Sequence, residues 1–194
     1  SAAGFVVALA DDSVAGGQLI LKFYNAVGGL ITTVTDADDP EGVNTPPGNE
    51  DDYRDVAITA LASGNYVVTW TDDINADIWA RVYSPTGVAQ TGLIEIESSG
   101  GAATFPHVTA LADGRFLVTY EQYLINTVRG RIYEANGTPS AGPFTIATNA
   151  ANATNQQVQS AALNDGRFVT VWRNTAGNIE GRAMFADGTP DGAA

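Results

Sequence analysis

The chain has 194 residues, of which 22 are acidic and 9 are basic, and its formal net charge at pH 7 is -13. We expect neither nucleic acids nor insertion into anionic membranes, because both partners favour a basic surface. The chain contains no cysteine, and no apolar run approaches the length of a membrane-spanning helix. These features fit an extracellular or cell-surface protein that does without disulfides.

The first unit, about residues 1–50, contains three apolar runs of strand length, GFVVALA, LKFY and GLITTVT. They are rich in β-branched and aromatic residues, and Gly and Asn stand between them, as expected for short strands joined by turns. This unit matches the later ones less closely than they match one another.

An acidic insertion follows, from Thr35 to Asp55, and it holds eight of the 22 acids of the chain. Crowded carboxylates repel one another, and calcium binds six to eight oxygens from flexible Asp-rich loops. The insertion therefore predicts a calcium site, and the alternative is a solvated surface loop. The candidate ligands are Asp36, Asp38, Asp39, Glu41, Asp51 and Asp52.

The next three units, about residues 51–104, 105–156 and 157–194, repeat one pattern. The stretches ALASGNYVVTW, ALADGRFLVTY and ALNDGRFVTVW begin at Ala60, Ala110 and Ala162, and ARVYSPTG, GRIYEANG and GRAMFADG follow them. A complete unit reads as four short strands, VAITAL, NYVVTW, DIWARVY and LIEIE. The turns SGN, DGR, TG and NG suit tight hairpins, where glycine adopts a positive φ angle.

The loop between the second and third strands of the second unit is also acidic. Asp72, Asp73 and Asp77 lie close together there with Asn75. Alternating oxygens on a tight loop predict a second calcium site, and the alternative is an ordinary polar hairpin loop.

The repeat predicts an all-β, β-propeller-like array of about four four-stranded antiparallel blades. Four-stranded units with a period near fifty residues are typical of propeller blades. The strand NYVVTW is apolar on both faces, as expected for sheets stacked on sheets. A β-sandwich also uses many short strands, but the regular period argues against it.

The pattern ALADGRFLVTY…RGRIYEANGTP…GPFTIAT resembles the β-propeller-like repeats of large secreted bacterial proteins. In those proteins the repeats occur beside hemolysin-type (RTX) calcium-binding repeats and adhesin modules. The resemblance covers nearly the whole chain and implies a propeller-like fold and an extracellular setting, without implying an activity. The turns TDDINAD, EQYLINTV and RNTAGN depart from the family's Asp/Gly-rich turn, and only the first keeps several acids.

One repeat position holds a basic residue in every unit, namely Lys22, Arg81, Arg131 and Arg182. Its recurrence favours a structural role between blades, pairing with a carboxylate or stacking on an aromatic ring. The alternative is a ring of ligand-binding cations, one in each blade.

Other chemistry has little support in the sequence. His107 is the single histidine and there is no cysteine, which excludes a zinc site of the usual kind, and no nucleophile motif accompanies it. A pair of carboxylates for glycoside hydrolysis depends on three-dimensional separation, and no pair stands out. The aromatic residues Tyr53, Trp79 and Tyr123 do not repeat between units, so they are the candidates for stacking on sugars.

These observations predict a non-enzymatic extracellular structural or adhesion module, with a glycan-binding, lectin-like propeller as the alternative. The first unit lacks a strand before GFVVALA, and the last lacks one after GRAMFADG. A sheet one strand short exposes unpaired backbone groups. We therefore expect a homo-oligomer or filament, or completion by neighbouring repeats of a longer chain.

Overall fold

The computed structural model describes residues 4–11, 18–35, 53–72, 76–98, 102–150 and 158–192. These residues form four antiparallel sheets, which we call blades 1 to 4, of three, four, four and three strands in chain order. Blade 1 contains β1 (Phe5–Ala10), β2 (Leu19–Tyr24) and β3 (Leu30–Thr35). Blade 2 contains β4 (Tyr53–Ala60), β5 (Tyr66–Asp72), β6 (Asp77–Tyr83) and β7 (Ile94–Glu97). Blade 3 contains β8 (Ala103–Ala110), β9 (Phe116–Gln122), β10 (Thr127–Tyr133) and β11 (Pro139–Ala147). Blade 4 contains β12 (Gln159–Ala162), β13 (Arg167–Arg173) and β14 (Ile179–Phe185).

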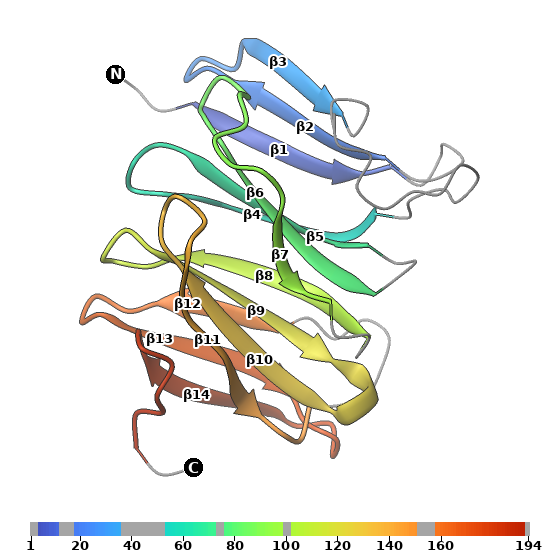
Figure 1. The fold of residues 1–194 in the computed structure, drawn as a ribbon, viewed down its shortest axis with the longest axis vertical. Helices are drawn as coiled ribbons and strands as arrows, with labels where there is room; N and C mark the ends of the chain where they lie inside the picture. The colour runs from blue at the N-terminus through green and yellow to red at the C-terminus, as the bar shows by residue number, and fades with distance from the viewer. Residues whose placement is uncertain are drawn as a thin grey trace.

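The blades lie one on the next in chain order, from blade 1 at one end of the molecule to blade 4 at the other (Figure 1). Each strand pairs with the next strand of its own blade, so every blade is a simple up-and-down sheet. The first strands β4, β8 and β12 pack against one another across blades and form the inner side of the array. The predicted all-β, propeller-like array, including its shorter terminal blades, is therefore confirmed.

The hydrophobic core is divided into three layers, one between each pair of successive blades. We call the face of a blade turned to the next blade its front face, and the opposite face its back face. Between blades 2 and 3, the front residues Val67 and Ile78 meet the back residues Phe116, Val118 and Tyr120. The other two layers repeat this arrangement. Every residue of β5 and of β9 is buried, because both faces of each of these strands lie in a core layer.

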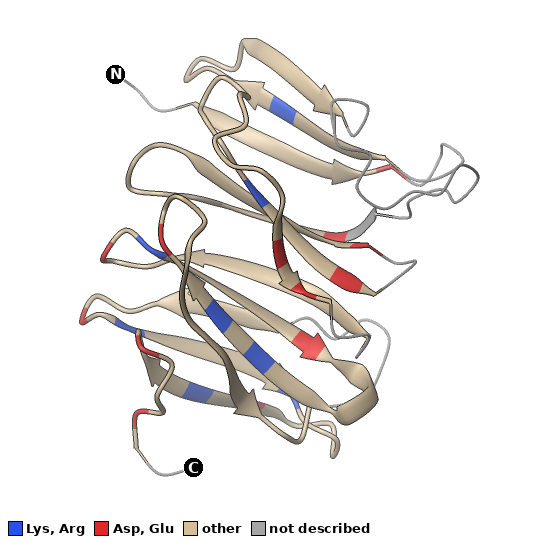
Figure 2. Cartoon of the chain, in the orientation of Figure 1, with Lys and Arg blue, Asp and Glu red and all other residues tan. Residues whose placement is uncertain are grey.

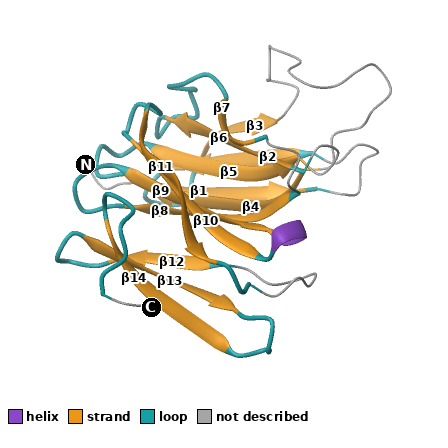
Figure 3. Ribbon diagram, turned by 60° about the horizontal axis from the view of Figure 1, so that its bottom comes forward, coloured by secondary structure: helices purple, strands orange, loops and turns teal. Residues whose placement is uncertain are grey.

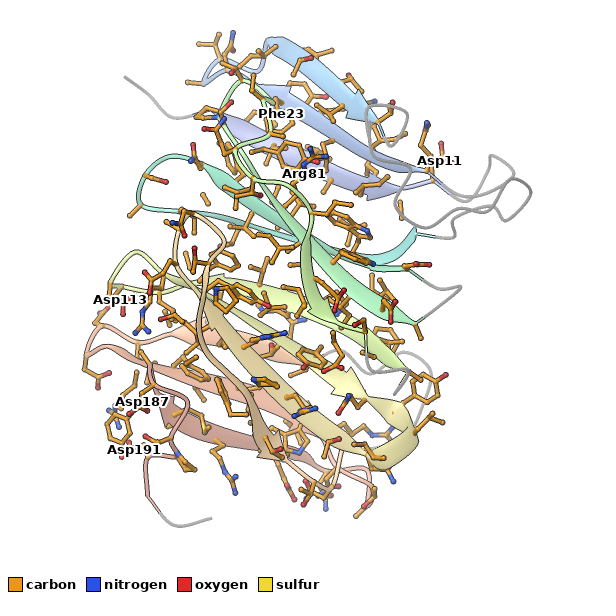
Figure 4. All side chains as sticks on the ribbon, in the orientation of Figure 1. Asp11, Phe23, Arg81, Asp113, Asp187 and Asp191 are labelled. Atoms are coloured by element: carbon orange, nitrogen blue, oxygen red, sulfur yellow. The ribbon has the colours of Figure 1, made fainter. Side chains whose placement is uncertain are left out.

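The turns of the first hairpin in each blade form as the sequence predicts. Gly64, Gly114 and Gly166 have φ angles of 89°, 91° and 86°. In the turns with the sequence DGR, an ion pair joins the aspartate to the arginine, and Arg115 Nη2 lies 2.6 Å from Asp113 Oδ2. Asp113 marks this turn at the edge of blade 3 in Figure 4.

Recurring arginines connect blades 3 and 4 to the blade before them. Arg131 donates a 2.9 Å hydrogen bond to the carbonyl of Ile96, and Arg182 donates a 2.7 Å bond to that of Ile146. Arg131 also lies 5.8 Å from the ring centre of Tyr133. The structural interpretation of this position is confirmed, although the partner is an outer-strand carbonyl and not a carboxylate. Arg81 donates within its own blade instead, to the carbonyl of Thr91.

A second connection comes from the turn glycine that follows each of these arginines. A Cβ atom on Gly137 would lie 2.6 Å from Ile94 in blade 2, and one on Gly188 would lie 2.4 Å from Phe144 in blade 3. The glycine at position 87 packs in the same way on Phe23 of blade 1, which Figure 4 labels beneath the β6–β7 connection.

Among the described residues, no helix is long and apolar enough to cross a membrane.

The core layers predict which tryptophans stabilise the fold. Trp70 and Trp172 are each 5% exposed within core layers, whereas Trp79 is only partly buried. Trp70→Ala and Trp172→Ala should each lower the free energy of unfolding by about 3–5 kcal/mol, as large aromatic truncations in a core do. Trp79→Ala should lower it by less. Denaturant unfolding of the three variants checks this order, and equal losses at all three positions would contradict it.

Candidate binding site at the inner-strand bulges

The inner strands of blades 2 and 3 are bulged at the same repeat position. Pairing with the next strand skips from Arg54 to Ala57 in β4, and from Thr104 to His107 in β8. Within these bulges Asp55 and Phe105 both have a φ angle of 54°. A positive φ is unfavourable for residues with a side chain, above all for a bulky one such as Phe, and such strain concentrates at functional sites. Bulges also re-aim side chains next to active sites.

A hydrogen bond joins the two bulges. The backbone N–H of Phe105 donates to Oδ2 of Asp55 over 3.3 Å, from blade 3 to blade 2. The strained segments of two blades therefore meet on the inner side of the array. We call the surroundings of these segments the bulge site, and its residues are Asp55, Thr71, Thr104, Phe105 and Glu121.

Glu121 is the buried carboxylate of the bulge site. It lies on β9, opposite Thr104 on one side and Val128 on the other, and is only 3% exposed. No described residue donates a hydrogen bond to its carboxyl group. Burial, and to a smaller extent the negative charge of Asp55, raises the pKa of Glu121 to about 7. This carboxyl group therefore carries a proton for part of the time at neutral pH.

Several buried hydroxyls also lack a hydrogen-bond partner among the described residues, and the hydroxyl of Thr104 is the one that lies beside Glu121. The Oγ1 atoms of Thr71 and Thr104 are buried without a hydrogen bond, and the same holds for Thr69 and Thr127. Thr71 lies opposite Arg54 at the β4 bulge, and Thr104 lies opposite Glu121 at the β8 bulge. Buried polar groups are nearly always hydrogen-bonded, so the unpartnered hydroxyl of Thr104 beside Glu121 calls for bound water or a polar ligand.

An exposed aromatic side chain lies at the same end of blade 3. Tyr123 begins the short 3-10 turn η2 (Tyr123–Ile125) directly after β9, drawn as the purple helix in Figure 3, and is 37% exposed. Trp79 instead packs partly buried between blades 1 and 2. Of the three sugar-stacking candidates, Tyr123 is thus the one placed on the surface beside the bulge site, while the side chain of Tyr53 lies outside the described residues.

Acidic residues lie at the ends of β5, β7 and β9 (Figure 2). Asp72 and Asp77 face each other across the hairpin of β5 and β6. Burial, then the charges of Asp72, Glu95 and Glu97, raise the pKa of Asp77 to about 6. Glu97 also accepts a 2.8 Å hydrogen bond from the hydroxyl of Tyr120, which ties blade 2 to blade 3.

The calcium prediction falls mostly outside the described residues. Asp73 lies outside them, as do the candidates of the acidic insertion, namely Asp36, Asp38, Asp39, Glu41, Asp51 and Asp52. Among the residues that the structure describes, no three or more acidic or histidine side chains are grouped to hold a metal ion. Calcium binding by the chain stays a prediction, and the hairpin pair Asp72 and Asp77 is the part of it that can be located.

His107 serves as a contact between blades. Its Nδ1 atom accepts a 3.3 Å hydrogen bond from the backbone N–H of Ser160 in blade 4. The hydroxyl of Thr109, 3.3 Å from the same nitrogen, donates to the carbonyl of Ser160. Burial lowers the pKa of His107, as expected for an imidazole that accepts a hydrogen bond inside the protein.

The sequence marks Glu121 as a departure from the repeat, although no motif contains it. In the repeat, this position holds Thr71 in blade 2 and Arg173 in blade 4, so the glutamate is a departure from the pattern. The acidic insertion predicted from the sequence ends at Asp55, whereas the structure places Asp55 in the inner strand β4. Neither the bulges nor the burial of Glu121 could be read from the spacing.

Comparison with known proteins finds similarity at the level of the fold. No protein-family model matches the sequence, and no curated protein is significantly similar to it. Among solved structures, a fungal fucose-recognising lectin with a six-bladed β-propeller, from Aleuria aurantia, is 13% identical with a TM-score of 0.49, over 98% of this chain and 65% of that one. An exo-β-1,3-galactanase from Phanerochaete chrysosporium, with β-1,3-galactotriose, is 13% identical with a TM-score of 0.51, over 100% of this chain and 49% of that one. An α-L-arabinanase from Penicillium chrysogenum, complexed with arabinobiose, is 14% identical with a TM-score of 0.52, over 94% of this chain and 58% of that one.

The chain thus spans about half to two thirds of the length of these proteins. It has a β-propeller-like fold, which the galactanase and the arabinanase share. The prediction that the chain is not an enzyme is wrong as an inference from this fold, because the galactanase and the arabinanase share it. The neighbours likewise do not support an identity with the adhesin-associated RTX repeats, and support the propeller fold alone.

The pKa of Glu121 predicts a distinctive pH dependence. Because the folded carboxyl binds its proton more tightly than the unfolded one, the free energy of unfolding should fall as the pH rises from about 4.5 to about 7. Glu121→Gln should remove this fall and make the protein more stable at about pH 8 by roughly 1–3 kcal/mol. Denaturant unfolding across this pH range checks it, with Glu134→Gln on the exposed turn after β10 as control. Parallel pH profiles for the parent and Glu121→Gln would contradict the assignment.

Calcium at millimolar concentration should raise the melting temperature relative to EDTA, because a ligand that binds only the folded state stabilises it. The double variant Asp72→Asn and Asp77→Asn locates the effect. A shift lost in this variant assigns the ion to the β5–β6 hairpin, and a shift retained assigns it to the acidic insertion. Identical melting of the parent in calcium and in EDTA would contradict calcium binding.

Proposed function

We propose that the chain is a glycan-binding domain and that the glycan binds at the bulge site. The observation that carries this proposal is the position of Glu121, a buried carboxyl group with a pKa of about 7, beside the unpartnered hydroxyl of Thr104 and the strained bulge at Phe105. Carbohydrate hydroxyls both donate and accept hydrogen bonds, so they suit a site that offers carboxyl and threonine oxygens together. Tyr123 supplies an exposed ring on which a sugar ring can stack.

Two kinds of observation favour a glycan over another polar ligand. The chain is strongly acidic, which disfavours anionic ligands and is neutral toward uncharged sugars. The galactanase and the arabinanase, which share the fold, were both solved with oligosaccharides bound. The recurring arginines do not form a second site of this kind, because Arg131 and Arg182 hold backbone carbonyls of neighbouring blades.

Binding to a panel of neutral oligosaccharides, including β-1,3-galactotriose and arabinobiose, tests the proposal by calorimetry. Thr104→Val keeps the shape of the side chain and removes its hydroxyl, and it should weaken binding by about 10-fold, the loss expected for one hydrogen bond. The matched control is Thr145→Val, at an exposed position on β11. No saturable binding to any member of the panel, or an equal loss in the control, would contradict a glycan site at the bulges.

Glycoside hydrolysis is a second candidate function, favoured by the raised pKa of Glu121. Glycosidases use one protonated carboxyl as general acid and a second carboxylate as nucleophile or base, and a pKa near the working pH suits the acid. Glu121 fits the first role, and Asp55, whose charge acts on it, is the candidate for the second. Release of reducing sugar from the bound oligosaccharides tests it. Glu121→Gln should abolish release while binding persists, and release that persists in this variant would exclude Glu121 as the acid.

A further inference from the structure

The back face of blade 1 is apolar and exposed. Phe5, Val7 and Leu9 of β1 are 47%, 37% and 42% exposed. The same positions in blade 3 hold Phe116, Val118 and Tyr120, which are 0% exposed because blade 2 covers them. The back face of blade 1 therefore carries side chains of the type that the other blades bury.

The details of this face match the buried back faces. In blade 3 the rings of Phe116 and Tyr133 stack 5.3 Å apart with an angle of 13°, inside the layer between blades 2 and 3. In blade 1 the corresponding rings of Phe5 and Tyr24 stack 4.8 Å apart with an angle of 11°. The turn glycine of blade 1 is open as well.

That glycine, Gly28, has no atom within 4 Å of an added Cβ, whereas Gly137 and Gly188 pack on the preceding blade. Lys22 occupies the position of the arginines that reach back to that blade. Blade 1 thus has the same apolar back face, turn glycine and basic residue with which the later blades contact the blade before them.

The front face of blade 4 shows the complementary feature. Val171 and Ile179 are 39% and 73% exposed. The residue at the position of Ile179 is Ile78 in blade 2 and Val128 in blade 3, and each of these is 0% exposed because the next blade covers it. Within one chain the two faces lie at opposite ends of the stack, so they do not cover each other (Figure 1).

We propose that the front face of blade 4 binds the back face of blade 1 of a second copy of this chain. The contact continues the interface that already joins blades 1 to 2, 2 to 3 and 3 to 4. Its geometry is set by the repeat: Thr119 and Thr170, at the positions of Val171 and Val7, both bond to the hydroxyl of Ser160 between blades 3 and 4. Val171 of one copy therefore comes close to Val7 of the other.

Because two different faces meet, the contact is head-to-tail, and it produces a closed ring or a growing filament. Exposed contiguous apolar patches are typical of protein interfaces. The proposal does not depend on glycan binding, since neither Val7 nor Val171 belongs to the bulge site.

Light scattering across a range of concentrations tests the association, with a mass of 20.2 kDa for the single chain. The parent should form species of two or more chains. Val7→Glu and Val171→Glu should each weaken association by about 100-fold or more, because each buries an unpaired charge in the contact. Both residues face solvent in the single chain, so these variants should fold, and circular dichroism checks this. The matched control is Val88→Glu, 59% exposed in the connection between β6 and β7, which should associate like the parent.

Mixing the two variants distinguishes a head-to-tail contact from a contact between like faces. Val7→Glu keeps an intact face on blade 4, and Val171→Glu keeps an intact face on blade 1, so the mixture should form a complex of two chains. The proposal is overturned if the parent is a monomer at every concentration. It is also overturned if the mixture stays monomeric while the parent associates.

Discussion

The structure depends on covering both faces of the second strand in blades 2 and 3. Every residue of β5 and of β9 is buried. Without a neighbour on each side, blade 2 and blade 3 would therefore expose apolar residues to solvent. A single four-stranded sheet buries too little apolar surface to be stable by itself. Stacking provides the missing burial, because each added blade covers the front face of the blade before it and presents its own front face to the blade after it. The same requirement explains the small residue at the centre of the third strand, such as Ala80, which is fully buried between blades 2 and 3.

Polar groups fix the stacking in register. The aliphatic layers would tolerate some sliding, but the bond from Arg131 to the carbonyl of Ile96 does not. The guanidinium satisfies an outer-strand carbonyl that would otherwise face a neighbouring blade without a donor. Between blades 3 and 4 the contacts of His107 and Ser160 have the same effect on the inner side. Apolar packing therefore supplies the stability and these bonds determine the alignment.

The fold could be predicted from the sequence to the level of individual strands, because the same pattern of apolar strands and glycine-containing turns repeats along the chain. The three core layers followed from NYVVTW and its copies, whose apolar residues occupy both faces. The bulge site could not be predicted, because it arises from an irregularity in pairing and from the meeting of residues fifty positions apart, Asp55 and Phe105. The partner of Arg131 was missed for a related reason, since a backbone carbonyl carries no signature in the sequence. Glu121 was visible only as an exception to the repeat.

The contacts between blades have a direction. Arg131 and Arg182 reach from a later blade to an earlier one, and Gly137 and Gly188 do the same. During synthesis on the ribosome, each blade that emerges would thus find the partners of its arginine and turn glycine already made, and only its front face would depend on the blade that follows. A chain of this design can fold as it is produced, one blade at a time, and the front face of the newest blade stays exposed until the next blade covers it.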